Sequence, residues 1–251
     1  MSQSVERFSS RIADYIKYRP GYPSEIVTLL KTECGLTHDS VVADIGSGTG
    51  KLTELFLANG NVVLGVEPNV GMRSAAEKIL ESFQNFTSVD GNAKATGLQN
   101  SSVDFVTAAQ AFHWFDPDKF KLEAQRILKA VGWVVITWNA RKLVSTPFLE
   151  DYERLLLAYG TDYQDIRHEK AEDLMPKFFA SKSCQVAIFP NAQVFDFEGL
   201  EGRLRSSSYT PEPGHPRFEH MIEELRNVFD RHQKKGRVLF EYDTKVFYGQ
   251  L

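Results

Sequence analysis

Short apolar runs alternate with amphipathic stretches over residues 41–139 of this chain. The run Val41–Ile45 is rich in β-branched residues and is typical of a strand that is buried on both faces. The segment that follows, Lys51–Asn59, has the apolar spacing of a helix. The same alternation predicts strands at Asn61–Glu67, Thr87–Asp90, Asp104–Ala109 and Trp133–Trp138, and helices at Ser24–Cys34, Val70–Glu81 and Asp118–Leu128. Strands that alternate with helices predict an α/β, doubly wound, mostly parallel sheet with right-handed crossovers.

The pattern changes after Asn139, where charged helical segments replace the regular alternation. We expect helices at Phe148–Tyr159, Ala171–Phe179, Gly199–Ser207 and Phe218–Lys234. Gln185–Phe197 is predicted to be extended, with a turn at Pro190-Asn191. Val238–Gly249 alternates between apolar and polar residues, which favours one or two antiparallel strands at the edge of the sheet.

Composition and charge narrow the class of protein. The chain has 29 basic and 33 acidic residues and a formal net charge of −4, which argues against a general nucleic-acid binder. Its two cysteines, Cys34 and Cys184, lie far apart and form no zinc-binding pattern, so we predict no metal site. The N-terminus is polar, and no window approaches the roughly 18 apolar residues of a membrane span. We therefore expect a soluble, cytoplasmic protein, monomeric or homodimeric, with no membrane or nucleic-acid partner.

A glycine-rich segment, Gly46–Gly50, lies between the first predicted strand and the helix after it. Such a loop directs free N–H groups at an anion, at the carboxyl edge of the sheet where this architecture binds ligands. The phosphate-binding P-loop is excluded, because Leu52 stands where it needs Ser or Thr and Ile45 stands where it needs glycine. The dinucleotide fingerprint is disfavoured, because its third glycine falls on Lys51. The remaining pattern is Asp-x-Gly-x-Gly-x-Gly, which begins at Asp44.

The segment DIGSGTG resembles the first motif of the class I S-adenosylmethionine-dependent methyltransferases. Further segments resemble later motifs of that family in the same order: VLGVEPN, VDGNAKATGL, DFVTAAQAFHWFD and LKAVGWVVITWN. The front segment YIKYRPGYP and the tail RVLFEYDTKVFYGQL are similar to the small-molecule, trans-aconitate-type subgroup. The chain departs from the family at Asn92, where Asp is more frequent, and at Ala130-Val131-Gly132, which replaces Lys-Pro-Gly or Arg-Pro-Gly.

The resemblance implies a seven-stranded Rossmann-like methyltransferase sheet with an antiparallel edge strand and a helical cap or lid. It also implies S-adenosylmethionine as the cofactor and S-adenosylhomocysteine as its product. We then expect a single domain with an N-terminal lid at 1–23, a cofactor-binding core at 24–139, a helical insertion at 140–182, and a C-terminal part at 183–251 that completes the sheet and the acceptor pocket.

Candidate cofactor residues follow the ends of the predicted strands. Glu67 could accept hydrogen bonds from both ribose hydroxyls, a role that would serve NAD equally well. Asn92 and Ala93 could contact the adenine edge, or they could form a simple turn. Gln110 and Ala111 would contact the cofactor through backbone atoms. The full set of expected cofactor-binding residues is Tyr18, Arg19, Asp44, Gly46, Ser47, Gly48, Thr49, Gly50, Glu67, Pro68, Asn69, Asn92, Ala93, Gln110 and Ala111.

Candidate acceptor residues come from the loop after the fourth strand and from the flanks of the core. His113 could orient or deprotonate an acceptor, or it could be a loop histidine beside Trp114. Tyr15, Tyr18 and Arg19 could form a lid in which Arg19 pairs with the cofactor carboxylate, or a surface helix. Arg203, Arg205 and Ser206–Ser208 could hold an anionic acceptor, or could be a solvated helix end. The expected substrate-binding residues are Tyr15, Phe112, His113, Trp114, Arg205 and Tyr209.

The predicted function is methyl transfer to a small-molecule acceptor such as a carboxylate. A carboxylate needs no general base, whereas a hydroxyl or an amine would make a base such as His113 useful. Two alternatives stay open at this point: a nicotinamide-dependent oxidoreductase, and a non-catalytic S-adenosylmethionine-binding protein on the same fold.

Overall fold

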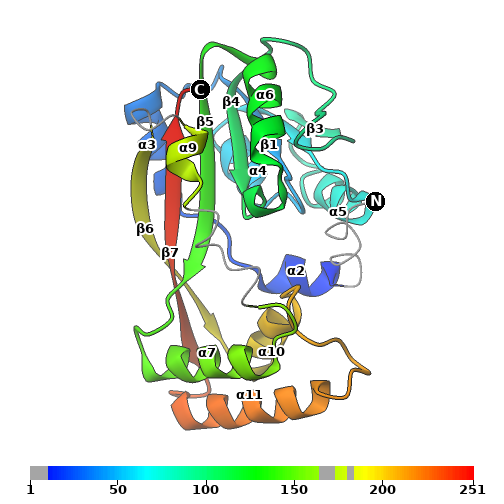
Figure 1. Ribbon diagram of the computed structural model, residues 1–251, viewed down its shortest axis with the longest axis vertical. Helices are drawn as coiled ribbons and strands as arrows, with labels where there is room; N and C mark the ends of the chain where they lie inside the picture. Colours follow the sequence, from blue (N-terminus) through cyan, green and yellow to red (C-terminus); the bar gives the residue numbers. More distant parts are fainter. Residues whose placement is uncertain (1–10, 164–172, 180–183) are drawn as a thin grey trace.

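A seven-stranded sheet forms the centre of the molecule in the computed structural model, which describes residues 11–163, 173–179 and 184–251 (Figure 1). The strand order is β3 (Phe86–Val89), β2 (Val62–Val66), β1 (Val41–Ile45), β4 (Val103–Ala109), β5 (Leu128–Arg141), β7 (Val238–Gly249) and β6 (Gln185–Phe195). The strands from β3 to β5 are parallel, and β7 is antiparallel to both of its neighbours. The predicted fold class, a doubly wound and mostly parallel sheet with antiparallel pairing toward one edge, is confirmed.

Helices cover both faces of the sheet, because alternate residues of the buried strands point to opposite sides. Val42 packs with residues of α3 (Glu25–Cys34) and α4 (Lys51–Ala58), and Ala43 packs with residues of α6 (Pro117–Ile127) and α9 (Met175–Phe178). The helix α5 (Val70–Ile79) follows β2, and a short 3-10 helix, η1 (Phe112–Trp114), follows β4. These crossovers bring the loops after β1, β2 and β4 to one edge of the sheet.

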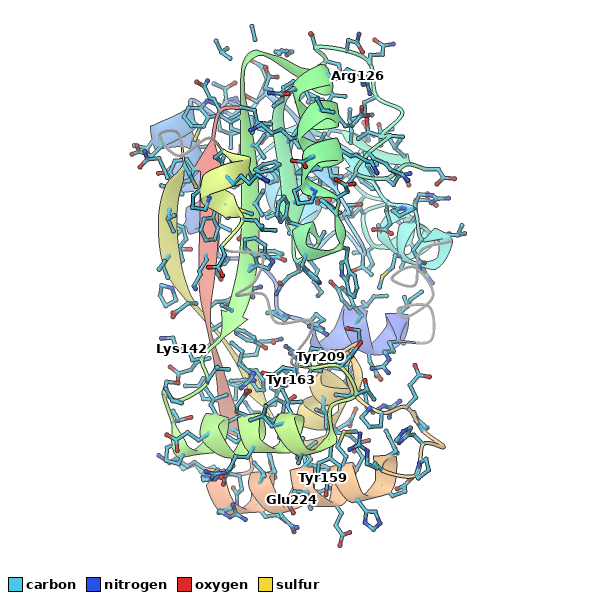
Figure 2. The ribbon with its side chains drawn as sticks, in the orientation of Figure 1. Arg126, Lys142, Tyr159, Tyr163, Tyr209 and Glu224 are labelled. Carbon is cyan, nitrogen blue, oxygen red and sulfur yellow. The ribbon has the colours of Figure 1, made fainter. Side chains whose placement is uncertain are left out.

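A second apolar core lies beyond that edge and forms a cap. It contains residues of α2 (Ile12–Tyr18), α7 (Pro147–Tyr159), α10 (Phe197–Arg205) and α11 (Phe218–His232), together with the extended ends of β6 and β7. Figure 1 shows the long strands β5, β6 and β7 reaching down to these helices, with α2 on the side of the cap that faces the sheet. Tyr163 and Tyr209 lie on the side of the cap that faces the sheet, with ring centroids 4.9 Å apart (Figure 2).

The predicted turn at Pro190-Asn191 is wrong. β6 runs through it without a break, and Pro190 is paired with Asp243 of β7. Proline lacks the N–H of a ladder, but β6 is an edge strand that has only one neighbour, so this loss is tolerated. Val238–Gly249 forms a single strand, β7, that lies between β5 and β6.

The cap combines segments that are distant in the sequence, since α7 packs on α11 and α2 packs on α10. Of the expected lid at 1–23, the structure describes the part from residue 11 onward, which includes the helix α2. The expected insertion at 140–182 is described as α7 and the short helix α9, and its residues 164–172 and 180–182, with the first two residues of the predicted helix Ala171–Phe179, lie outside the described residues. No helix in the described part of the chain has the length and apolar character that a membrane span needs.

Candidate functional site

The glycine loop between β1 and α4 adopts a backbone that only glycine accepts easily. Gly46 has φ +70°, and a Cβ added there would lie 2.7 Å from the Cβ of Ala111. The N–H of Gly46 donates to the carbonyl of Val66 at 2.8 Å, which fixes the start of the loop against the end of β2. The loop therefore lies close to the segment after β4, and a larger residue at Gly46 would push the two apart.

Asp44 lies beneath this loop, at the end of β1. Its side chain is buried and accepts hydrogen bonds from the hydroxyls of Thr53, at 2.7 Å, and Thr107, at 2.9 Å. Burial raises the pKa of Asp44 to about 6. Asp44 lines neither of the two cavities described below, so its carboxylate supports the loop from behind.

Glu67 follows β2 and is buried at the opposite side of the loop. Its carboxylate accepts the N–H of Gly48 at 3.0 Å and the N–H of Asn69 at 2.8 Å. Burial raises the pKa of Glu67, although these two hydrogen bonds oppose the shift. The side chain of Asn69 accepts the N–H of Met72 and so begins α5. The backbone N–H groups of Gly48 and Asn69 thus fix the Glu67 carboxylate at the wall of the larger cavity described below.

The larger cavity has a volume of about 550 Å³ and opens at the carboxyl edge of the sheet. It unites most of the residues predicted after four different strands: Gly46, Gly48, Glu67, Pro68, Asn69, Asn92, Ala93, Gln110 and Ala111, with Tyr15 and Trp114 from the predicted acceptor set. It also contains lining residues that the sequence analysis missed: Met72, Lys94, Ala109, Phe115, Asp116 and Lys119. Some of these residues could have been found because they lie close in sequence to the predicted ones. Met72 is about one helical turn beyond Asn69, and Phe115 directly follows Trp114.

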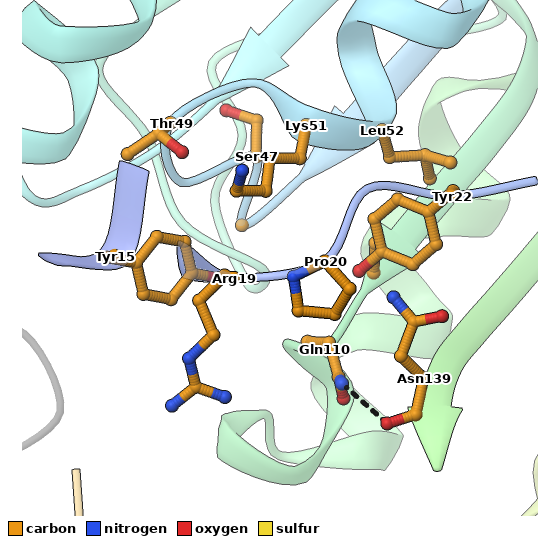
Figure 3. Close-up of a pocket in the computed structure, with 12 residues that line it drawn as sticks. Tyr15, Arg19, Pro20, Tyr22, Ser47, Thr49, Lys51, Leu52, Gln110 and Asn139 are labelled. Carbon is orange, nitrogen blue, oxygen red and sulfur yellow. Dashed lines mark hydrogen bonds between the residues drawn. The ribbon is translucent and has the colours of Figure 1, made fainter. Parts of the chain in front are cut away.

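A smaller cavity of about 30 Å³ shares Tyr15, Gly46, Ala109 and Gln110 with the larger one (Figure 3). It is lined by Tyr15, Arg19, Pro20, Tyr22, Gly46, Ser47, Thr49, Lys51, Leu52, Ala109, Gln110 and Asn139. Three buried polar atoms around it have no partner within the described residues: Nε of Arg19, Oγ1 of Thr49 and Oε1 of Gln110. Unsatisfied buried groups each cost about 1–3 kcal/mol, so this set favours a ligand that both accepts and donates hydrogen bonds.

Gln110 is held in an unusual backbone conformation at the end of β4. Its φ is +52°, in the left-handed region that non-glycine residues seldom occupy. Its N–H donates to the carbonyl of Thr137 at 3.0 Å, and its side-chain N–H donates to the carbonyl of Asn139 at 3.2 Å (Figure 3). The side-chain oxygen is thereby directed away from β5, and backbone strain of this kind concentrates at functional sites.

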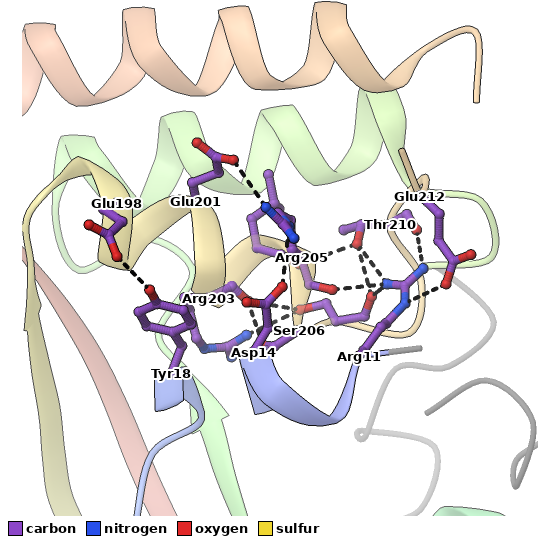
Figure 4. A network of polar contacts seen from close by, with 12 residues as sticks. Arg11, Asp14, Tyr18, Glu198, Glu201, Arg203, Arg205, Ser206, Thr210 and Glu212 are labelled. Atoms are coloured by element: carbon purple, nitrogen blue, oxygen red, sulfur yellow. Dashed lines mark hydrogen bonds and ion pairs between the residues drawn. The ribbon is translucent and has the colours of Figure 1, made fainter. Parts of the chain in front are cut away.

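The predicted lid helix presents one tyrosine to the site and one to the cap. Tyr15 lines both cavities. Tyr18 packs in the cap core against Gly202, and its hydroxyl donates to Glu198 at 3.1 Å (Figure 4). Arg19 lines the smaller cavity, and the terminal nitrogen NH2 of its guanidinium donates to the carbonyl of Ser206 at 2.8 Å. Of these three predicted residues, Tyr18 therefore faces away from the cavities.

Most other predicted acceptor residues do not line these cavities. Phe112 is buried among the rings of Phe115, Phe120, Trp138 and Phe178. His113 packs beside Trp114, with ring centroids 4.8 Å apart. Arg205 forms ion pairs with Asp14 at 3.2 Å and Glu201 at 3.5 Å (Figure 4). Tyr209 lies in the cap beside Tyr163. Of the predicted glycine-loop residues, Ser47 and Thr49 line the smaller cavity, and Gly50 lines neither.

Comparison with known proteins gives a consistent set of similarities. Residues 43–136 match the model of a methyltransferase domain family. An uncharacterized methyltransferase-like protein of Schizosaccharomyces pombe is 28% identical over 97% of this chain and 94% of its own length. An uncharacterized methyltransferase of Mycobacterium tuberculosis is 34% identical over 53% of this chain and 52% of its own length.

Solved structures share the whole fold at low sequence identity. A putative type II methyltransferase from Anaeromyxobacter dehalogenans has a TM-score of 0.67 at 17% identity, covering 93% of this chain and 98% of its own. A methyltransferase from Geobacter sulfurreducens, solved in complex with S-adenosylhomocysteine, has a TM-score of 0.53 at 16% identity, covering 99% of this chain and 98% of its own.

Proposed function

We propose that this chain, an S-adenosylmethionine-dependent methyltransferase of the class I fold, methylates a small-molecule acceptor, and that the acceptor atom is a carboxylate oxygen. We also assign it to the trans-aconitate-type subgroup. The similarity of the front segment YIKYRPGYP and the tail RVLFEYDTKVFYGQL to that subgroup supports the assignment, and the front segment contributes Tyr15, Arg19, Pro20 and Tyr22 to the wall of the smaller cavity.

The smaller cavity carries the cofactor part of the proposal. S-adenosylmethionine ends in an amino acid with a carboxylate and an ammonium group, and it supplies a methyl carbon activated by a sulfonium. Arg19 and Thr49 would donate to that carboxylate, and Oε1 of Gln110 would accept from that ammonium. All three are buried atoms around the smaller cavity that have no partner within the described residues. The residues present therefore fit the group in both charge and hydrogen-bonding capacity.

The larger cavity would hold the nucleoside. Glu67 would accept hydrogen bonds from the ribose hydroxyls, because each carboxylate oxygen has a further lone pair beyond its bond to Gly48 or Asn69. Asn92 and Ala93 would contact the adenine, with Met72 packing on its face. A cavity of about 550 Å³ lies within the range of sites that bind ligands of this size.

The acceptor class rests on two observations about the chain. Arg203, which is buried, and Arg19, which is partly buried, lie around the cap and the lid and favour an anionic molecule. His113, the predicted base, does not line either cavity, and a carboxylate requires no base because it has no proton to lose. The carboxylate oxygen forms the new bond to the methyl carbon, the carbon–sulfur bond breaks, and its electron pair stays on sulfur. The products are a methyl ester and S-adenosylhomocysteine.

Calorimetry and a labelled methyl donor together test this function. We expect S-adenosylhomocysteine to bind and NADH not to bind. Donor labelled in its methyl group should transfer label from a small-molecule extract into a product that alkali hydrolyses, as it does a methyl ester. Binding of NADH alone would identify an oxidoreductase, and cofactor binding without any turnover would identify a non-catalytic protein. A product stable to alkali would overturn the carboxylate, and label in protein or nucleic acid would overturn the small-molecule acceptor.

A further inference from the structure

We propose that the cap binds an anionic group of the acceptor through an arginine cluster, defined here as Arg19, Arg141 and Arg203, and that this group is distinct from the atom that is methylated. The inference rests on the proposed function, since it assumes that the molecule bound in the cap is the acceptor. It assigns a binding role to Arg141, which no sequence motif indicated.

Two members of the arginine cluster are held rigidly inside the cap. Arg203 is 5% exposed, donates to the hydroxyl of Tyr242 at 3.0 Å and to that of Ser207 at 3.1 Å, and stacks over the ring of Phe240. The side chain of Arg141 is 9% exposed, forms an ion pair with Glu153, and donates to the hydroxyl of Tyr163 at 2.8 Å. One nitrogen of Arg141, NH1, is buried and has no partner within the described residues.

The three guanidinium groups converge on Tyr209. Burial raises the pKa of Tyr209, but the positive charges of Arg203, Arg19 and Arg141 outweigh it and lower the pKa from its ordinary value. Arg19 and Arg203 bind neighbouring residues at the end of α10, Ser206 and Ser207. The ring of Tyr209 also packs on Tyr163, the partner of Arg141 (Figure 2). The cluster therefore forms one electropositive region around Tyr209.

The described residues do not balance the positive charge of this region. Among the described contacts of the three arginines, the only carboxylate is that of Glu153. Two nearby arginines outside the cluster do have acidic partners, since Arg11 pairs with Glu212 at 3.1 Å and Arg205 pairs with Asp14 at 3.2 Å (Figure 4). Burial and the charge of Arg203 lower the pKa of Arg19, as expected of a cation without an anionic partner. Uncompensated buried charge is costly, and a bound anion removes that cost.

The position of Tyr15 connects the cluster to the cofactor cavities. Tyr15 lines both cavities, and its ring lies under the guanidinium of Arg19 at 5.5 Å. An acceptor anchored by the cluster would therefore extend past Tyr15 toward the larger cavity. An anion whose lone pairs are engaged by guanidinium donors is a weak nucleophile, so the anchored group would not be the one that attacks the methyl carbon.

Anion binding to protein saturated with S-adenosylhomocysteine tests the proposal. The probes are succinate and inorganic phosphate, which separate a carboxylate site from a phosphate site, with dimethyl succinate as the uncharged control. We expect succinate or phosphate to bind saturably by calorimetry, dimethyl succinate not to bind, and Arg203→Gln and Arg141→Gln each to weaken anion binding about tenfold or more. The matched control is Arg11→Gln, since Arg11 is also 9% exposed at the junction of α2 and α10 but is balanced by Glu212. It should leave anion binding within about twofold.

A further variant, Glu153→Gln, distinguishes loss of the anion site from misfolding of the cap. It removes the one carboxylate that pairs with the cluster among the described residues, so anion binding should become several-fold tighter, which a misfolded cap cannot produce. Unchanged or weaker anion binding in Glu153→Gln, or an equal loss in Arg11→Gln, would overturn the arginine cluster as the site. S-adenosylhomocysteine affinity is measured in every variant. Failure of the wild type to bind it refutes the proposed function, whereas normal cofactor binding without anion binding refutes only this inference.

Discussion

The cofactor half and the cap half of this site are built in different ways. In the cofactor half, backbone geometry dominates, and many of the contributing residues directly follow a strand, as Gly46 follows β1 and Glu67 follows β2. In the cap half, long side chains dominate, and Arg141 and Arg203 come from segments that are more than sixty residues apart in the chain. Mutations should therefore separate the two halves, because the first depends on local backbone conformation and the second on charge and long-range packing.

The largest expected effect is on the backbone of the glycine loop. Gly46→Ala should weaken S-adenosylhomocysteine binding by about 100-fold or more, since left-handed backbone costs about 1–2 kcal/mol in alanine and the loop must also move. The added Cβ would lie 2.7 Å from that of Ala111 and 3.3 Å from the ring of Phe115. Calorimetry with S-adenosylhomocysteine measures the effect.

The matched control for this variant is Gly35→Ala. Gly35 has φ +69°, nearly the same as Gly46, but nothing lies within 4 Å of an added Cβ. It ends α3, away from both cavities. We expect Gly35→Ala to lower stability in urea unfolding by about as much as Gly46→Ala does, and to leave cofactor affinity unchanged. Equal loss of cofactor affinity in both variants would mean that general strain, and not the shape of the loop, controls binding.

The same contrast explains what could be predicted from the sequence. The sequence could predict that residues after strands lie close together, because a parallel sheet brings the carboxyl ends of β1, β2, β3 and β4 to one edge whatever the rest of the chain does. The larger cavity contains Glu67, Asn92 and Gln110 for this reason. Met72 was missed, because its inclusion depends on which face of α5 turns toward the cavity.

The cap could not be predicted in this way, because helix orientation decides which residue faces inward. Tyr15 and Tyr18 lie about one turn apart on α2, and only Tyr15 lines the cavities. Arg203 and Arg205 are two residues apart on α10, about 200° around the helix, and Arg203 is the buried one. Arg141 lies beyond the end predicted for its strand, because pairing with β7 extends β5 to that residue. Each outcome depends on long-range packing that the sequence pattern does not contain.

A second test removes charge from the cofactor half alone. Glu67→Gln should weaken S-adenosylhomocysteine binding by about 10- to 100-fold, because hydrogen bonds to a charged group contribute about 1.5–3 kcal/mol. Anion binding in the cap should not change. Burial raises the pKa of Glu67, so wild-type cofactor affinity should fall with decreasing pH sooner than for an exposed glutamate, whereas the Gln variant should lack this step.

Asp90→Asn serves as the control for the loss of an acid near this cavity. Asp90 is 74% exposed and pairs with Arg73 at 3.2 Å, so its removal should cost less than about 1 kcal/mol and leave cofactor affinity nearly unchanged. A Glu67→Gln variant as close to wild type as this control would show that the ribose is not held by Glu67.

A third test concerns the support beneath the glycine loop. The pKa of Asp44 is raised by burial from 3.8 to about 6, so between these values the folded protein keeps a proton that the unfolded chain releases. Stability should therefore fall as pH rises from about 4 to about 6 and this contribution should be constant above that range, with a total of about 1–3 kcal/mol. Asp44→Asn should lack this contribution. Urea unfolding of both proteins at several pH values measures it, and two parallel curves would refute the shifted pKa.

The smallest expected effect separates the two tyrosines of α2. Tyr18→Phe removes a hydrogen bond to Glu198, whose side chain is 78% exposed, so the loss of stability should stay below about 1 kcal/mol and cofactor affinity should not change. Tyr15→Ala should weaken S-adenosylhomocysteine binding about tenfold, because it removes a wall that both cavities share. If Tyr18→Phe were to weaken binding as much, the lid would have to turn on cofactor binding so that Tyr18 enters the site. The cap and the cofactor half would then move together when the cofactor binds. Mutations could separate the two halves only in the protein without ligand.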